Sequence, residues 1–175
     1  MARVRGHAGI GHAGIGRAGR AREAAMIVLD YYDGPLQGFA RGAFGADCCY
    51  FQIVAWSRWN DYRLFAVVAI EPETFQRVAD ALAQADAGRP GAVGPARWAF
   101  ADRATAVQMD ALLHRCIEQA HSPGFLCLTD AAATAPLARV TTDEALRRRV
   151  GAALSSGRMA DLREWRGVVR PPAER

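Results

Sequence analysis

The sequence predicts an α+β domain in which an antiparallel β-sheet of three to five strands is covered by two or three helices. Strand-like segments come first in the chain and helix-like segments follow, an order typical of this class. The clearest β signal is a hairpin formed by residues 49–56 and 62–70, which are rich in β-branched and aromatic residues and are joined by a short loop. The clearest helical signal is the apolar stripe of residues 103–121. We therefore expect the hairpin at the centre of the sheet, with this helix packed across it.

Four other segments have strand-like patterns. Residues 26–32, MIVLDYY, predict a buried strand that ends at the turn cluster Asp33-Gly34-Pro35. Residues 38–44 are expected to return as a second strand. Shorter strands are predicted at residues 97–101 and 125–130.

Two further helices are predicted, at about residues 72–86 and 142–156. The first begins at a proline flanked by acids, where a missing N–H is harmless and the helix dipole favours negative charge. The second is expected to open with a capping box formed by Thr141 and Glu144. The residues predicted to face inward are Phe75, Val78, Ala79 and Leu82 in the first helix of the chain, Met109, Leu112, Leu113, Cys116, Ile117 and Ala120 in the second, and Leu146, Val150, Ala153 and Leu154 in the third.

The first 25 residues contain the dinucleotide-binding pattern G-x-G-x-x-G twice, in the stretch GHAGIGHAGIGRAG. A working fingerprint needs a buried strand before it and a helix after it, and neither pattern is present here. The stretch is a tandem GHAGI repeat of low complexity, which buries too little apolar surface to fold. We expect residues 1–25 to be a disordered arm, with Met26 as an alternative start. Residues 26–170 are expected to be a single globular domain and residues 171–175 a frayed tail, with no cofactor.

Composition narrows the chemistry. All 22 basic residues are arginine, which suggests a GC-rich bacterial coding bias. The absence of lysine argues against P-loop, Schiff-base and protein-kinase chemistry. The arm carries five arginines and one glutamate and so accounts for the whole net charge of +4, which makes a nucleic-acid partner unlikely for the neutral remainder. No apolar run approaches the roughly 20 residues of a membrane span, and no secretory pattern opens the chain, so we expect a cytoplasmic protein.

The four cysteines predict buried, reduced thiols rather than a disulfide or a metal site. Cys48 and Cys49 are adjacent and would point to opposite faces of a strand. Cys116 and Cys127 form no C-x-x-C pair. His114 and Cys116 lie about 200° apart around a helix, so they do not share a metal ion. No metal site is predicted.

An enzyme is one alternative. The stretch VLDYYDG resembles the opening of haloacid dehalogenases, in which a hydrophobic strand ends in D-x-D. The resemblance implies a nucleophile and an acid/base at Asp30 and Asp33, whose spacing here is one residue longer than in that family. On an extended strand this spacing turns the two side chains to opposite faces. His114 lies in one helical row with Asp110 and Glu118 and would be the accompanying base.

A second alternative is weak nucleic-acid binding through the C-terminal region. Arginines surround Trp165 there, an arrangement that would suit a single strand. Nearby acids neutralise much of this charge. The arginines are Arg147, Arg148, Arg149, Arg158, Arg163 and Arg166.

The favoured interpretation is a small non-catalytic protein-interaction or regulatory domain. No convergent catalytic set is visible, whereas the loop of the central hairpin carries residue types that are enriched at binding hot spots. If the first strand lies beside this hairpin, Tyr31 and Tyr32 would flank that loop. The predicted binding residues are Tyr32, Asp33, Arg58, Trp59 and Asp61, with a protein as the partner and with no catalytic, cofactor or metal residue.

Overall fold

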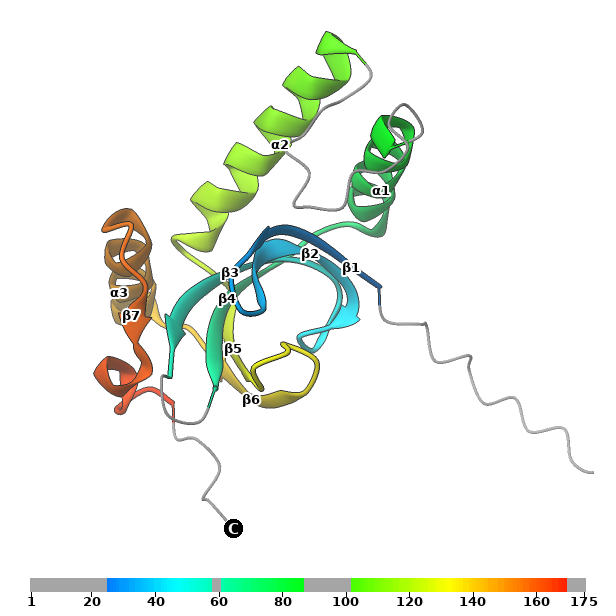
Figure 1. Ribbon diagram of the computed structural model, residues 1–175. Coiled ribbons are helices and arrows are strands. Elements are labelled where there is room, and N and C mark those ends of the chain that lie inside the picture. Colours follow the sequence, from blue (N-terminus) through cyan, green and yellow to red (C-terminus); the bar gives the residue numbers. More distant parts are fainter. Residues whose placement is uncertain (1–24, 58–60, 87–101, 170–175) are drawn as a thin grey trace, which may run out of the picture.

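A curved antiparallel sheet, with three helices on its outer side, forms the fold (Figure 1). The computed structural model describes residues 25–57, 61–86 and 102–169. The α+β class predicted from the sequence is confirmed. The strands are β1 (Ala25–Tyr31), β2 (Pro35–Ala43), β3 (Ala46–Trp56), β4 (Arg63–Ala69), β5 (Phe125–Thr129), β6 (Pro136–Thr141) and β7 (Ala160–Asp161), and the helices are α1 (Pro72–Asp86), α2 (Arg103–Ala120), α3 (Glu144–Ser155) and the 3-10 helix η1 (Leu162–Trp165).

The strands β1 to β6 lie in the sheet in the order in which they occur in the chain, and every neighbouring pair is antiparallel. Helices α1 and α2 both lie between β4 and β5 in the chain, although these two strands are neighbours in the sheet. Strand β7 pairs in parallel with the end of β3. The sheet thus has seven strands rather than the three to five expected. The two that were not predicted are β6, which is largely exposed and shows no buried alternation, and the two-residue β7.

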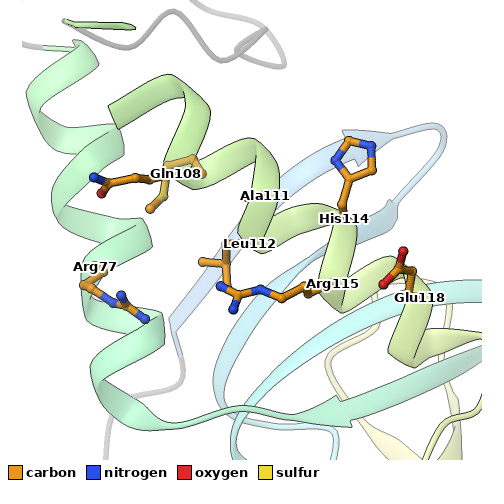
Figure 2. A pocket seen from close by; sticks show the side chains of 8 residues that line it. Arg77, Gln108, Ala111, Leu112, His114, Arg115 and Glu118 are labelled. Atoms are coloured by element: carbon orange, nitrogen blue, oxygen red, sulfur yellow. The ribbon is translucent and has the colours of Figure 1, made fainter. Parts of the chain in front are cut away.

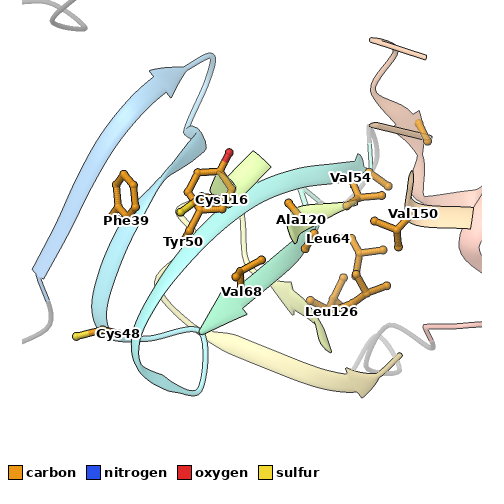
Figure 3. Close-up of a cluster of buried hydrophobic side chains, with 14 of the residues drawn as sticks. Phe39, Cys48, Tyr50, Val54, Leu64, Val68, Cys116, Ala120, Leu126 and Val150 are labelled. Atoms are coloured by element: carbon orange, nitrogen blue, oxygen red, sulfur yellow. The ribbon is translucent and has the colours of Figure 1, made fainter. Parts of the chain in front are cut away.

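The outer face of the sheet carries the larger core. Alternate residues of the central strands, such as Tyr50 and Val54 in β3, point toward the helices. They pack against buried residues of α1, α2, α3 and η1, including the fully buried Trp165. Figure 3 shows Cys116, Ala120 and Val150 beside the side chains of the strands. The predicted stripes of the three helices supply this layer, and Val78, Cys116 and Val150 are among its buried members.

The inner, concave face is buried by the sheet itself. Phe44, Phe51 and Phe65 pack together there, with ring centroids 4.7 to 5.5 Å apart. No helix residue belongs to this inner cluster within the described part of the chain. Arg139 of β6 lies over the ring of Phe125 at 3.7 Å and donates a hydrogen bond to the Gly45 carbonyl at 3.2 Å. This side chain therefore links the last strand of the sheet to the turn between β2 and β3.

The backbone restricts the residue type at three positions near the inner face. Phe44 and Gly45 both have positive φ, as a two-residue hairpin turn requires, and the ring of Phe44 is buried in the inner cluster. At Gly38, a Cβ atom would come within 2.1 Å of the Ile27 carbonyl oxygen and 2.9 Å of the Phe51 ring. Strand β1 therefore lies too close to β2 at this point for any side chain.

The start of α3 differs from the prediction. Asp143, not Thr141, is the N-cap, and its carboxylate accepts a hydrogen bond from the Leu146 N–H at 2.8 Å. Thr141 ends β6, and the capping box with Glu144 is therefore wrong. Asp143 directly precedes the first residue of α3, and its carboxylate can accept hydrogen bonds from N–H groups of the first helical turn. A capping box does occur later, between Asp161 and Glu164 at η1.

Several predictions lie outside the described residues. These are the strand at 97–101, most of the arm at 1–25 and the tail at 171–175. The first described strand begins at Ala25, one residue before the predicted strand start at Met26. The prediction that this strand is buried is wrong, because β1 is an edge strand and none of its residues is buried. Among the helices of residues 25–57, 61–86 and 102–169, none combines the length and the apolar composition of a membrane span.

Candidate functional site

Exposed aromatic side chains gather at one end of the sheet. Tyr31 and Tyr32, at the end of β1, are 60% and 64% exposed. The Tyr32 ring lies 6.2 Å from the ring of Trp56, which ends β3. We call these three residues, together with the turn Asp33-Gly34-Pro35, the aromatic end. Large aromatic side chains are costly to leave in water unless they serve a contact, which makes this end a candidate binding surface.

The Arg63 side chain, from the first residue of β4, stabilises the turn of the aromatic end. This side chain is only 3% exposed. Its guanidinium donates to the carbonyl oxygens of Asp33 and Pro35, and it lies 5.8 Å from the Trp56 ring. Gly34 has a φ of +127°, and a Cβ atom there would be 2.6 Å from the Arg63 Cζ atom. A buried cation thus fixes the turn on which both tyrosines are presented.

Among the described residues of this turn and of the hairpin end beside it, the exposed charged side chains are acidic, while Arg58 lies outside the described residues. Asp30, Asp33 and Asp61 are all exposed, whereas the nearby Arg63 is buried.

Asp130, in the turn between β5 and β6, accepts hydrogen bonds from the Thr134 N–H and hydroxyl, both at 2.9 Å. Partial burial raises the pKa of Asp130, but these hydrogen bonds outweigh it and hold the pKa below its ordinary value. Asp130 therefore shapes its own turn and remains ionised.

The structure brings together part of the predicted binding set. Tyr32 contacts Trp56 and the Asp33 carbonyl accepts a hydrogen bond from Arg63, so both residues lie at the base of the hairpin, although β2 separates β1 from β3 in the sheet. Arg58 and Trp59 lie outside the described residues. The Asp33 carboxylate makes no described hydrogen bond, so the turn depends on the Asp33 carbonyl instead.

Two residues of this end were not predicted as functional. Trp56 and Arg63 were assigned only to strands. Trp56 and Arg63 are opposite each other in the β3–β4 pairing, on either side of the predicted hairpin loop. That position was the available signal, since residues that close a hairpin loop share its end of the sheet.

In the enzyme alternative, no described contact joins Asp30 or Asp33 to His114. The His114 ring donates from Nδ1 to the Asp110 carbonyl at 2.9 Å, and the Asp110 carboxylate lies 3.6 Å away. The His114 ring, the Asp110 carbonyl and the Asp110 carboxylate all belong to one exposed turn of α2. His114 lines a groove between α1 and α2, and neither Asp30 nor Asp33 is among the lining residues.

This groove has a volume of about 560 Å³. Arg77 of α1 and Arg115 of α2 extend into it from opposite walls, while His114 points away from α1 (Figure 2). Met109 and Leu112, which also belong to the outer core, form its apolar floor. Its lining residues are Arg77, Gln108, Met109, Ala111, Leu112, His114, Arg115 and Glu118.

The arginine-rich C-terminal region uses its aromatic residue internally. Trp165 is 1% exposed, and the Arg149 guanidinium covers its ring at 4.5 Å. Arg158 forms an ion pair with Glu164 at 3.3 Å. The ring that would stack on a base in the nucleic-acid alternative is therefore already buried in the core.

The cysteines are buried and reduced, as predicted from their spacing. Cys48 packs in the outer core and Cys49 in the inner one. Burial raises the pKa of Cys49 to about 12 and that of Cys116 and of Cys127 to about 11. Their thiols stay protonated at neutral pH, so none is suited to act as a nucleophile. Within the described residues, no group of three His, Cys, Asp or Glu side chains could hold a metal ion.

Comparison with known proteins identified no relative. The chain matches no protein-family model, no curated protein and no solved structure.

Proposed function

We propose that this protein is a small non-catalytic protein-interaction domain that binds its partner at the aromatic end. The observation that carries the proposal is the pair of exposed tyrosines, Tyr31 and Tyr32, on a turn fixed by the buried Arg63. Tyrosine and tryptophan supply much of the binding energy at protein interfaces. A turn that is already ordered loses little conformational entropy on binding.

The chemistry of this end also favours one kind of partner. Asp30 and Asp33 flank the tyrosines in the chain and are exposed, and Asp61 is exposed next to the hairpin end that carries Trp56 and Arg63. A segment with an apolar or proline side chain, flanked by arginine or lysine, would pack on the rings and neutralise these acids. We therefore propose a protein segment with basic residues as the partner.

Selection of peptides from a random displayed library tests this proposal directly. The wild-type protein is the bait, and the double variant Tyr31→Ser/Tyr32→Ser is the comparison. Both tyrosines are exposed, so the double variant should keep its fold, which circular dichroism and the urea midpoint would verify. Val107→Ser removes an exposed apolar side chain on α2 and serves as the matched control.

We expect enriched peptides to share an apolar or proline residue next to a basic one. Their affinity should fall roughly 30-fold in the double tyrosine variant, the loss expected for a hot spot, and stay unchanged in Val107→Ser. Peptides that bind the double tyrosine variant as tightly as the wild type would rule out the aromatic end. So would a selection that enriches no common motif.

A further inference from the structure

The two edges of the sheet are built differently. At one edge, β6 begins with Pro136, and the Arg139 side chain lies over the Phe125 ring on the inner face. A proline and an inward-pointing charge are features by which natural proteins keep an edge strand from pairing with another chain. At the other edge, β1 contains no proline and no basic residue, and its only charged side chain is Asp30. The β1 edge therefore lacks these two protective features.

Strand β1 also has an unused hydrogen-bonding side. Among the residues that the structure describes, only β2 pairs with β1, so the opposite edge of β1 presents backbone N–H and C=O groups without a ladder partner. Its side chains are apolar on both faces of the sheet. Ile27 and Leu29 pack against the outer core, and Met26 packs against the inner core. None of them is fully buried, so an added strand would extend both cores as well as the ladder.

The regular part of β1 leads directly to the aromatic end. Residues 25–28 pair with β2 in an unbroken register, and an irregularity follows between Val28 and Asp30. Tyr31 and Tyr32 come immediately after Asp30 and are both exposed. A segment paired with residues 25–28 would therefore reach the two tyrosines at one of its ends.

The neighbouring strands indicate the direction of such a segment. Every neighbouring pair from β1 to β6 is antiparallel, and antiparallel pairing is slightly more stable per residue than parallel pairing. An antiparallel segment on β1 would place its N-terminal residues at the aromatic end. The exposed carboxylates of Asp30 and Asp33 would attract basic residues at that position.

We infer that the partner segment binds as an antiparallel β-strand on the free edge of β1, with basic residues at its N-terminal end followed by a run of β-branched residues. The basic residues meet Asp30 and Asp33 beside the tyrosines, and the β-branched run pairs with residues 25–28. This inference rests on the proposed function, because it specifies how the partner segment of the aromatic end is bound.

Four synthetic peptides test the inference by fluorescence anisotropy with the full chain. The parent peptide has arginines followed by a run of alternating valine and threonine, and the reversed peptide has the arginines after the run. The other two carry N-methyl groups on alternate amides of the run, one on the odd amides and the other on the even amides. A strand at a sheet edge uses only alternate N–H groups for pairing, so these two peptides are matched controls for each other.

We expect the parent peptide to bind roughly 10-fold more tightly than the reversed peptide. One N-methylated peptide should lose roughly 10-fold or more in affinity, because its hydrogen bonds to β1 are removed, and the other should bind like the parent. The inference is overturned if the parent peptide does not bind, if the reversed peptide binds equally well, or if the two N-methylated peptides bind alike.

Amide hydrogen exchange of the full chain locates the bound peptide. The parent peptide should slow exchange at alternate residues of the segment 25–28, whose N–H groups point to the free edge, and should leave β6 unchanged. Binding without slower exchange in β1 would overturn the inference, and so would slower exchange confined to β6.

The double variant Tyr31→Ser/Tyr32→Ser distinguishes this inference from the proposed function. It should bind the parent peptide roughly 10-fold more weakly than the wild type. Equal binding would overturn the proposed function. Peptides from the displayed library that need the tyrosines but do not slow exchange in β1 would support the proposed function and overturn the inference.

Sedimentation equilibrium tests whether a second copy of the chain occupies the same edge. The wild type should have the mass of a monomer with and without the parent peptide. A dimer that the parent peptide dissociates would assign the β1 edge to a second copy of the chain and would overturn the inference of a partner segment.

Discussion

The two faces of the sheet are buried by different means. The outer face needs three α-helices and η1 to cover it, and its core contains residues from every one of them. The inner face is filled by aromatic side chains of the strands, with Phe44, Phe51 and Phe65 at its centre. The outer core therefore depends on docking of distant segments, whereas the inner core depends on the curvature of the sheet. We therefore expect a substitution in the inner core to destabilise the whole domain.

The largest effect is expected from Phe51→Ala. The side chain is fully buried between two other rings, so its loss should lower the free energy of unfolding by about 4 kcal/mol. Leu112→Ala, on the outer face at the floor of the groove, should cost about 2 kcal/mol because that site opens to solvent. Urea unfolding measures both. Hydrogen exchange should show faster exchange throughout the strands for Phe51→Ala but mainly in α2 for Leu112→Ala, and the reverse pattern would contradict the comparison.

The next effect tests the close approach of β1 and of the Phe51 ring to Gly38. Gly38→Ala places a methyl group against the Ile27 carbonyl oxygen and the Phe51 ring, and it should destabilise the protein by about 2 kcal/mol. Gly124→Ala is the control, since a Cβ atom there meets nothing within 4 Å. Its free energy of unfolding should stay within about 0.5 kcal/mol of the wild type. Equal midpoints for the two variants in urea would show that β1 does not need this glycine.

The buried thiols predict a loss of stability in alkaline solution. Cys49 has a pKa of about 12 in the folded protein and 9.0 as its ordinary value, so the unfolded chain releases the proton first. Stability is therefore intact below about pH 9 and falls between pH 9 and 12. At pH 10 the loss from this thiol is about 1 kcal/mol. The change in unfolding free energy between pH 8 and pH 10 should be smaller by that amount in Cys49→Ala, and an unchanged pH dependence would refute this assignment.

The smallest effect concerns the side chain that closes the inner face. Arg139→Met removes the cation over Phe125 and the hydrogen bond to the Gly45 carbonyl, and should cost about 1 kcal/mol. Arg148→Met, on the exposed surface of α3, should leave the urea midpoint unchanged. If the two variants have the same midpoint, the link between β6 and the β2–β3 turn contributes nothing to stability.

The same contrast explains which parts of the fold the sequence could predict. The helices were located well because each has one apolar stripe, and α1 begins and ends where expected, at Pro72 and Asp86. The central strands were recognised because both faces are apolar. The sequence does not indicate which residues cover the inner face of these strands. Phe51 and Phe65 pack there against side chains that come from other strands and that are distant in the chain. Strand β6 was missed since its side chains are mostly exposed and it is defined by hydrogen bonds to β5.

The candidate sites show a similar division. Tyr32 and Asp33 were named because turn residues and exposed aromatics can be recognised locally. Arg63 could not be recognised in the same way, because in the sequence it resembles any strand residue. It stabilises the turn by donating hydrogen bonds to carbonyl oxygens about thirty positions earlier in the chain. The groove arginines, Arg77 and Arg115, are on two different helices, and only the tertiary structure brings them together.

The place of α1 and α2 in the chain also bears on how the domain folds. Strands β1 to β4 follow one another through short turns, so their pairing requires only small loops to close. Strand β5 joins β4 only after the chain has made a long excursion through both helices, and closing such a loop has a larger entropic cost. We expect the four-stranded meander to form early and to act as the template on which β5 and β6 are added.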